Sequence, residues 1–221
     1  MDFDDKNNIV YYYNIWLNVI DMLKDRKYDS EGLDQYYRNI DFDEFKSMYK
    51  DQTLDIRAKH TEYAKDVVVM FTDIKVKKFK KDELNKIIDI AKTTKENDRD
   101  IHVIILISDK IQDNMLKKIK EFHDENSKGL EGEKITIEMY PYNQLAFNVT
   151  KHEYVPQHIL ITDSEEKKRI LNEYNAKQSE FPKIKSSDPV CKWYGGKHGD
   201  LFKIYRVTER SEKSIAYRIV N

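Results

Sequence analysis

Two aspartates and a lysine in the first half of the chain are of the types that a metal-dependent nuclease uses. Asp66 is followed by the triplet Asp73-Ile74-Lys75. Two carboxylates could hold Mg²⁺ while the lysine orients the attacking water. The same residues bracket short runs with strand character, where polar ends are expected, and isolated motif matches are often fortuitous. A nuclease that uses Asp66, Asp73 and Lys75 is therefore the alternative interpretation of this chain.

The segment from Gly195 to Asp200 has the composition of a phosphate-binding loop but not its pattern. It reads GGKHGD, lacks the Gly-Lys-Ser/Thr ending of a P-loop, and follows a predicted helix instead of preceding one. Such glycines are better explained by left-handed backbone at a helix end and by the close approach of a partner. We therefore expect no nucleotide site and no cofactor.

The histidines and the cysteine also predict no chemistry. His152 and His158 could form a metal-binding pair, but no cysteine or carboxylate pattern completes a tetrahedral zinc set. We expect both to make structural hydrogen bonds around Pro156 or to contact a partner. Cys191 has no Cys-His-Asn context and is expected to be a small buried hydrophobic residue. The sequence thus predicts no catalytic residue and no metal site.

A cluster of lysines follows the possible nuclease triplet. Lys75, Lys77, Lys78, Lys80 and Lys81 lie within seven residues. On a strand, such lysines can protect an open sheet edge against aggregation. They can also make loose contacts with DNA phosphates. Together with the basic C-terminal end of the chain, they leave a free-standing nucleic-acid binder as a further alternative. Neither an aromatic RNA-binding motif nor a helix-turn-helix signal accompanies them, so sequence-specific reading of nucleic acid is not predicted.

The charge balance argues against a protein that binds nucleic acid on its own. The formal net charge is −1 over 221 residues, which gives no field to attract a polyanion. The ends differ, however: residues 1–55 carry 13 acidic and 7 basic side chains, a net of −6, and residues 183–221 carry 9 basic and 4 acidic ones, a net of +5. Opposed ends indicate either two surfaces that meet different partners or ordinary variation of the surface charge.

Composition also bounds the compartment. A single cysteine permits no internal disulfide and is typical of a reducing environment. The acidic start is unlike a secretory signal, and the longest apolar run, Val103 to Ile107, is too short to cross a bilayer. We expect no membrane partner.

The periodicity of apolar residues predicts a helical start followed by alternating strands and helices. Helices are expected at 7–26, at 30–38 and from a capping box at Asp41 and Glu44. The expected elements that follow are strands at 66–71 and 74–79, a helix at 82–97, a strand at 102–107, a helix at 109–124 and a strand at 134–139. This order predicts a three-layer α/β domain over residues 1–148.

Residues 149–221 are predicted to form a second, smaller domain with a mixed sheet. A strand at 158–162 and a helix at 163–174 come first. Asp188-Pro189 has the form of a helix start, with Asp as N-cap and Pro at the first helical position. Strands at 201–207 and 214–220 end the chain. The fold class is therefore α/β plus α+β, joined without a Gly- or Pro-rich linker.

An ordered series of residues in this second domain resembles a known family. The series runs His152-Glu153-x-Val155-Pro156-x-His158, the helix at 162–174, Pro182, Ile184, Asp188-Pro189-Val190, Tyr194-Gly195, Gly199 and Tyr217-Arg218-Ile219-Val220. It resembles the C-terminal domain of the fifth common subunit of eukaryotic RNA polymerases I, II and III, whose archaeal counterpart consists of this domain alone. The first 148 residues resemble the jaw domain of the eukaryotic subunit by layout, with its nuclease-like topology.

The resemblance implies a non-catalytic polymerase subunit without cofactors. Its partners would be the largest polymerase subunit, other polymerase subunits and downstream DNA beside the lower jaw, and it would not be a homo-oligomer. The residues expected to contact the largest subunit are His152, Val155, Pro156, His158, Asp188, Pro189, Val190, Tyr194, Gly195, Gly199, Tyr217 and Arg218. The residues expected near DNA are Lys75, Lys77, Lys78 and Lys110.

Two departures from the family pattern indicate a divergent member. The stretch Ser108-Asp109-Lys110-Ile111 lacks the proline of the turn that opens the DNA-facing helix in cellular relatives. Gly196 and Asp200 also replace residue types that are usual in the glycine segment. A protist or a large DNA virus would fit, so the expected location is the nucleus for a cellular protein, or the virion or infected-cell transcription site for a viral one.

Overall fold

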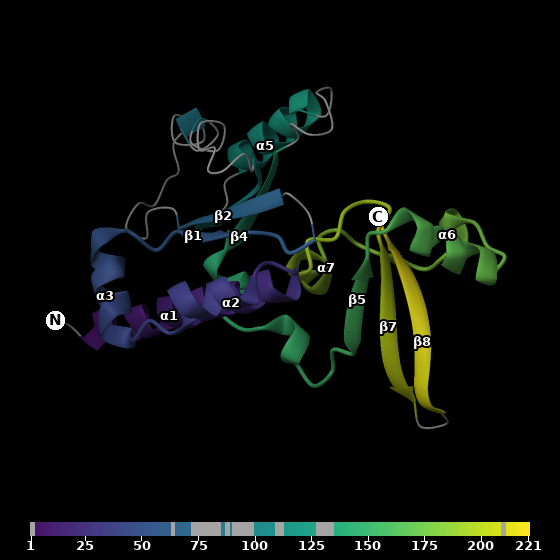
Figure 1. The fold of residues 1–221 in the computed structure, drawn as a ribbon, viewed down its shortest axis with the longest axis horizontal. Helices are drawn as coiled ribbons and strands as arrows, with labels where there is room; N and C mark the ends of the chain where they lie inside the picture. Colours follow the sequence, from purple (N-terminus) through teal and green to yellow (C-terminus); the bar gives the residue numbers. More distant parts are fainter. Residues whose placement is uncertain are drawn as a thin grey trace. The chain divides into compact units, whose positions relative to one another are not determined.

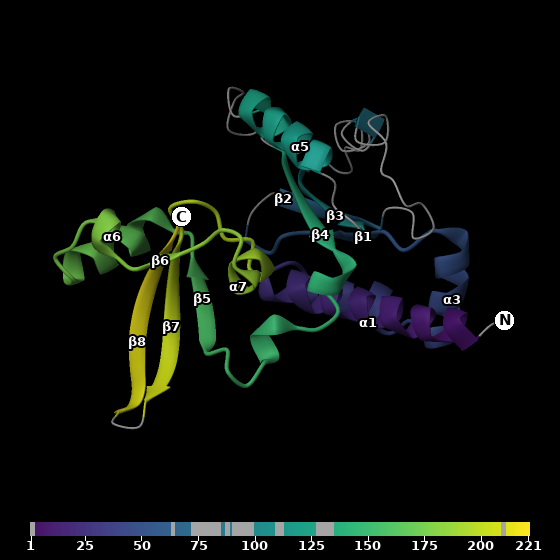
Figure 2. The same cartoon turned by 180° about the vertical axis from the view of Figure 1, so that it is seen from behind.

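The chain forms two compact units, Met1–Phe147 and Asn148–Asn221. A computed structural model describes residues 3–62, 65–71, 85–86, 89, 100–108, 113–126, 135–208 and 211–221. Figures 1 and 2 show the elements of each unit from opposite sides. Both units mix helices with a sheet, which confirms the predicted mixture of α and β structure.

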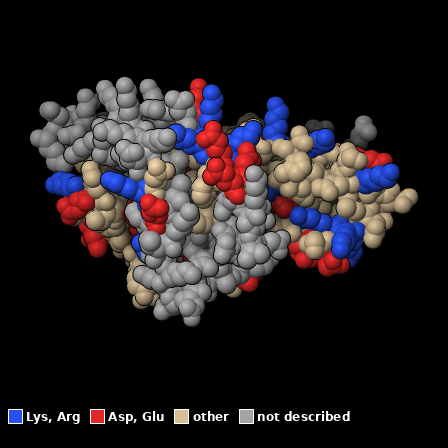
Figure 3. Space-filling model, turned by 90° about the horizontal axis from the view of Figure 1, so that it is seen from above, with Lys and Arg blue, Asp and Glu red and all other residues tan. Residues whose placement is uncertain are grey.

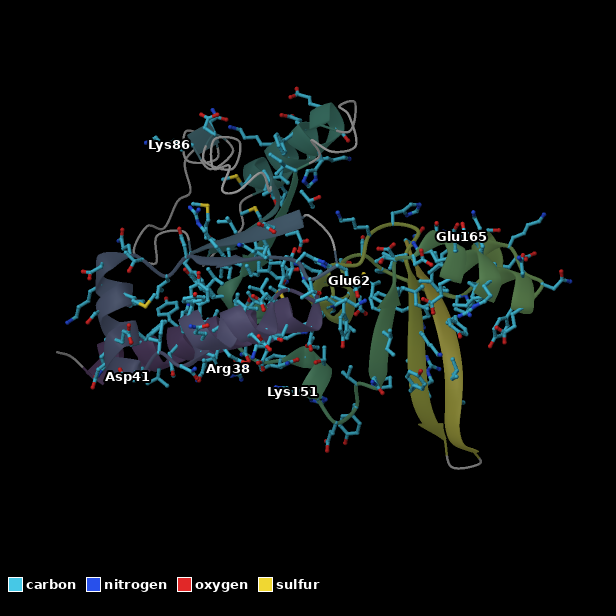
Figure 4. The ribbon with its side chains drawn as sticks, viewed as in Figure 1. Arg38, Asp41, Glu62, Lys86, Lys151 and Glu165 are labelled. Atoms are coloured by element: carbon cyan, nitrogen blue, oxygen red, sulfur yellow. The ribbon has the colours of Figure 1, made fainter. Side chains whose placement is uncertain are left out.

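Helices build the start of the first unit. The long helix α1 (Phe3–Asp25) is followed by α2 (Ser30–Leu33), a π-helical turn η1 (Asp34–Arg38) and α3 (Phe42–Asp51). The carboxylate of Asp41 (Figure 4) accepts hydrogen bonds from the backbone N–H groups of Asp43 and Glu44, which confirms Asp41 as the N-cap of the predicted capping box. The predicted helix at 30–38 is present, but its second half has π geometry.

The inner face of α1 supplies the core of this helical part. The buried side chains of α1 are those of Ile9, Ile15, Trp16, Val19, Ile20, Met22 and Leu23. The indole N–H of Trp16 donates to the carbonyl of Leu54 at 3.2 Å, and the ring centroids of Trp16 and Phe45 are 5.5 Å apart. The apolar periodicity that predicted this helix therefore marks the face that packs.

A four-stranded sheet completes the first unit. Its strands are β1 (Ile56–Ala58), β2 (Lys65–Phe71), β3 (Asp100–Ser108) and β4 (Thr136–Pro141), in that order across the sheet. β2, β3 and β4 run parallel, and β1 pairs with β2 antiparallel. Val67, Val68 and Val69 are all buried, as expected for a strand covered on both faces. In both views α1 and α5 (Asp113–Asn126) lie on opposite sides of the sheet.

Some predictions for this unit lie outside the described residues, and others differ from the structure in their bounds. The predicted strand at 74–79 and most of the helix at 82–97 lie outside the described residues, although Asn85, Lys86 and Asp89 are helical. β1 was not predicted, because a three-residue strand shows too little alternation. β4 begins and ends two residues later than the predicted strand at 134–139.

A buried charged network joins the end of α1 to the sheet. The guanidinium of Arg26, 6% exposed, donates to the Glu138 carboxylate at 2.9 Å and to the Tyr140 hydroxyl at 2.7 Å. The Tyr140 hydroxyl donates to Glu138 at 3.0 Å. Burial favours the neutral form of Arg26, but attraction to Glu138 outweighs it and raises the pKa of the guanidinium. Burial also raises the pKa of nearby Tyr28 to about 12.

The second unit is a mixed sheet between two helices. Its elements are the 3-10 turn η4 (Val149–Lys151), β5 (Gln157–Ile161), α6 (Ser164–Glu173), the 3-10 turn η5 (Gln178–Glu180), β6 (Lys183–Ile184), α7 (Pro189–Trp193), β7 (Leu201–Thr208) and β8 (Ser211–Val220). The sheet order is β5-β7-β8-β6; β6 runs parallel to β8 and the other pairs are antiparallel. The predicted strands and helices are confirmed, and the two-residue strand β6 was missed.

Each face of this sheet carries its own apolar cluster. On the α6 face, Ile161, Leu201 and Ile219 pack with Ile170 and Phe181. On the other face, Ile184, Cys191, Phe202, Ile204 and Val220 form the cluster beneath α7. Adjacent residues of β7 therefore alternate between the two clusters, as the side-chain period of a strand requires.

Removing the charge of Glu138 should destabilise the first unit strongly. The variant Glu138→Gln leaves the Arg26 guanidinium buried beside a neutral amide, which costs on the order of 3 kcal/mol of unfolding free energy. Urea titration followed by circular dichroism measures this. The control is Glu165→Gln, which breaks the exposed Lys168–Glu165 pair and should change stability little. Equal effects of the two variants would contradict this role of the network.

Candidate partner-binding site

The site is built around α7 and the turn that ends it. The carboxylate of Asp188 accepts the backbone N–H of Val190 at 2.9 Å, and Pro189 occupies the first helical position. Past Tyr194, the N–H of Gly195 donates to the Lys192 carbonyl at 3.0 Å and that of Gly196 to the Cys191 carbonyl at 2.9 Å. With Gly195 at φ 68°, this is a Schellman ending, which needs a residue that tolerates left-handed backbone.

Gly196 is required by packing. A Cβ atom at this position would lie 2.9 Å from the Sγ atom of Cys191 and 3.2 Å from the ring of Phe202. Cys191 is fully buried, which confirms the prediction of a small buried residue. The sequence did not indicate this role of Gly196, because the contact with Phe202 comes from a strand that follows later in the chain.

The rest of the glycine segment is closed by its own aspartate. The Asp200 carboxylate accepts the N–H of Lys197 and the ammonium of Lys167, both at 2.8 Å. Gly199, at φ 86°, donates its N–H to the Val220 carbonyl at 3.0 Å. Because a carboxylate already occupies the Lys197 amide, the turn is poorly suited to bind a phosphate. The prediction that this segment binds no nucleotide therefore has a structural reason.

The segment before β5 lies next to this helix. η4 lies against α7. His152 and Tyr154 are exposed, and Val155 and Pro156 are half-buried. The His158 Nδ1 atom lies 2.6 Å from the Pro156 carbonyl, and its ring meets Phe202 edge-on at 5.8 Å. The expected hydrogen bond around Pro156 is thus present. Tyr154, at 83% exposure, was not singled out from the sequence.

The twelve predicted contact residues do not share one surface. His158 and Arg218 lie on the α7 face of the sheet, because they pair with Ile204 and Phe202 of the cluster on that face. Asp188 caps α7 itself. Tyr217 is on the opposite face, where its ring contacts Tyr174 and Phe181 at 5.5 and 6.4 Å. Val190 is only 7% exposed and lies in the interior of the unit. The exposed or half-buried members on the α7 side are His152, Val155, Pro156, His158, Asp188, Pro189, Tyr194, Gly195, Gly199 and Arg218.

Most of the residues proposed for DNA contact or nuclease chemistry lie outside the described residues. These are Lys75, Lys77, Lys78, Lys110 and Asp73. Asp66 is described and lies in β2, where it pairs with Ile101. Within the described residues no group of three side chains is placed to hold a metal ion. Likewise, none of the described helices is long and apolar enough to span a bilayer.

Charges of both signs are mixed on the visible face in Figure 3. Some basic side chains of the second unit nevertheless have no acidic partner among the described residues. Arg206, Arg218, Lys183 and Lys185 make no salt bridge within the described part of the chain, whereas Lys167 is paired with Asp200. These unpaired basic side chains are available to a negatively charged partner.

Comparisons with known proteins identify both parts of the chain. Residues 147–220 match the family described as "RNA polymerase Rpb5, C-terminal domain". "DNA-directed RNA polymerases I, II, and III subunit rpabc1" of Dictyostelium discoideum is 30% identical over 91% of this chain and 92% of its own length. "DNA-directed RNA polymerases IV and V subunit 5B" of Arabidopsis thaliana is 26% identical over 95% of this chain and 89% of its own length. "DNA-directed RNA polymerase subunit Rpo5" of Methanothermobacter thermautotrophicus is 43% identical over 33% and 92%.

Packing around Gly196 gives a double-mutant test. Gly196→Ala should destabilise the protein by about 1–3 kcal/mol, because the new methyl group overpacks against Cys191. Combining it with Cys191→Ala removes the Sγ atom, so the double variant should be more stable than the sum of the single effects predicts. Urea unfolding of the four proteins measures the coupling. Simple additivity would contradict direct contact between the two positions.

The burial of His158 predicts a pH dependence. Burial lowers the pKa of His158 below its usual 6.5, so the unfolded chain binds the proton more readily than the folded one. The contribution of neutral His158 to the unfolding free energy is therefore fully present above about pH 6.5 and is lost progressively as the pH falls below that value. Unfolding free energy measured from pH 7.5 to 5 should fall less steeply for His158→Gln than for the wild type. Parallel curves would contradict the effect.

Proposed function

The chain belongs to the Rpb5 family of DNA-directed RNA polymerase subunits, and on that premise we propose that it is a structural, non-catalytic subunit of a multisubunit polymerase that takes part in transcription. The observation that carries the proposal is the similarity to the Dictyostelium subunit, which extends over 91% of this chain and 92% of that protein. Nucleotidyl transfer would then belong to other chains of the complex.

We assign assembly to the second unit. The archaeal Rpo5 aligns over 92% of its length with only 33% of this chain, and the matched family domain covers residues 147–220. A subunit of about this size can therefore serve an archaeal polymerase without a counterpart of the first unit. The domain division proposed from the sequence, 1–148 and 149–221, assigns the same role to this part.

The proposed docking surface is centred on α7. It consists of the segment His152–His158, the exposed end of α7 at Pro189, and the turn from Tyr194 to Gly199. The two left-handed glycines hold the turn in a shape with little side-chain bulk, so a partner can approach the backbone closely. The proposed partner is the largest polymerase subunit. An interface of about 1,600 Å² in total would give stable docking.

For the first unit we propose the position of a lower jaw beside downstream DNA, with a nuclease-like topology. Its mixed sheet with helices on both sides supports this proposal, as does the lysine cluster at 75–81 for loose phosphate contacts. No observation favours the alternative nuclease. A cellular protein would act in the nucleus, and a viral one in the virion or at the infected-cell transcription site.

Affinity purification from the source organism tests the proposal. The tagged chain should co-elute with the large polymerase subunits at equal stoichiometry, measured by quantitative mass spectrometry. Pro189→Glu should reduce this recovery at least tenfold, since it places a charge on the docking surface while a glutamate suits the first turn of a helix. The matched control is Ser164→Glu, at the same position of α6, which should leave recovery unchanged.

The two possible failures are distinct. If the wild-type chain elutes without polymerase subunits, the proposed function is wrong. If it elutes with them and Pro189→Glu does so equally well, the function stands and the docking surface lies elsewhere.

A further inference from the structure

One strand of the second unit keeps a long open edge. β8 has ten residues, and β7 pairs with it along one side. On the other side β6 has two residues and pairs only with Ile219 and Val220. No other strand of the described residues pairs with this side of β8. The open edge, Ile215–Arg218, therefore lies in line with β6, beyond the residue at which β6 begins.

Hydrogen bonds show which backbone groups face outward. The N–H of Val220 donates to Asp200, on the β7 side, and the N–H of Ile219 donates to Pro182, on the β6 side. Backbone groups alternate along a strand, so those of Ala216 and Arg218 face β7, while those of Ile215 and Tyr217 face the open edge. Two N–H and two C=O groups are thus presented to a further strand.

The side chains beside this edge differ between the two faces. On the α6 face stand Ile215, 46% exposed, and Tyr217, with the half-exposed ring of Tyr174 behind it. On the α7 face stand the small Ala216 and the guanidinium of Arg218. In Figure 1 the β7–β8 hairpin extends beyond the helices of this unit, so its outer half is not covered by them.

Charge around the edge favours an acidic partner. Arg218 makes no salt bridge in the described part of the chain, and neither do Arg206 across the hairpin or Lys183 and Lys185 in and after β6. Sheet edges are normally protected by charged side chains, prolines or bulges. The open side of Ile215–Arg218 carries one charged side chain, Arg218, and beside it the exposed Ile215 and the half-buried Tyr217, so an added strand would cover apolar surface on one face and meet a positive charge on the other.

We propose that the open edge of β8 binds an extended segment of another polymerase subunit, which adds to the sheet as a fifth strand in line with β6. Residues opposite Ile215 and Tyr217 are apolar, because they share the α6 face with these side chains. The residue opposite Arg218 is Asp or Glu, which pairs with the guanidinium. Such strand addition takes affinity from the backbone and specificity from alternate side chains. This proposal rests on the proposed function, because the added segment would belong to another subunit of the polymerase.

Amide exchange tests the geometry directly. In the isolated full-length chain, the amides of Ile215 and Tyr217 should exchange readily. In the purified polymerase, they should slow at least tenfold, because each then donates to the added strand. The amides of Ala216 and Arg218 are internal controls, protected by β7 in both samples. Exchange in deuterated buffer, quenching and fragmentation mass spectrometry resolve the neighbouring positions.

A proline substitution tests whether the outward N–H group of Ile215 is needed for incorporation into the polymerase. Ile215→Pro removes one outward N–H group, and proline is tolerated at a strand edge where that group makes no ladder bond. It should keep the thermal midpoint near that of the wild type and lower recovery in the polymerase about tenfold. Ile215→Val retains the N–H group and should assemble normally.

Each contrary outcome has its own meaning. If the chain does not co-purify with polymerase, the proposed function fails. If it does, but exchange at Ile215 and Tyr217 is unchanged, or Ile215→Pro assembles normally, strand addition is wrong while the function stands. Protection of these amides in the isolated chain, together with a dimer by light scattering, would show that a second copy covers the edge and would also overturn the proposal.

Discussion

The pairing of β7 with β8 is the constraint on which the second unit depends. Leu201 and Phe202 are adjacent and completely buried, yet they enter different clusters on opposite faces of the sheet. A shift of the register by one residue would exchange the two faces and bring Lys203 and Arg218 into the clusters. The helices α6 and α7 can therefore cover the sheet only when this pairing is correct.

The candidate docking surface follows from that pairing. α7 is held by burial of its own Cys191 and by an ending that brings Gly196 against Phe202 of β7. The same turn returns the chain to β7, with Gly199 bonded to the end of β8. A five-residue helix has little stability of its own, so packing keeps it in place. Its exposed end and the turn are therefore positioned by hydrogen bonds and by packing against the core.

Local signals in the sequence predicted much of this unit. Asp188-Pro189 predicted the start of α7, and the glycines predicted its left-handed end. The sequence could also have assigned the side chains of Tyr217 and Arg218 to opposite faces of the sheet, because neighbouring residues on a strand point to opposite sides. The partners of Gly196, the two-residue strand β6 and the pair of Arg26 with Glu138 depend on residues distant in the sequence. No local pattern specifies them, because tertiary packing alone brings them together.

Cross-linking mass spectrometry of the native polymerase tests whether the second unit holds this chain in the complex. Lys183, Lys185 and Lys197 are exposed on the second unit, and an amine-reactive cross-linker should join them to the largest polymerase subunit. Cross-links from these lysines only to proteins outside the polymerase, or only to this chain, would contradict the account that this unit holds the chain in the complex.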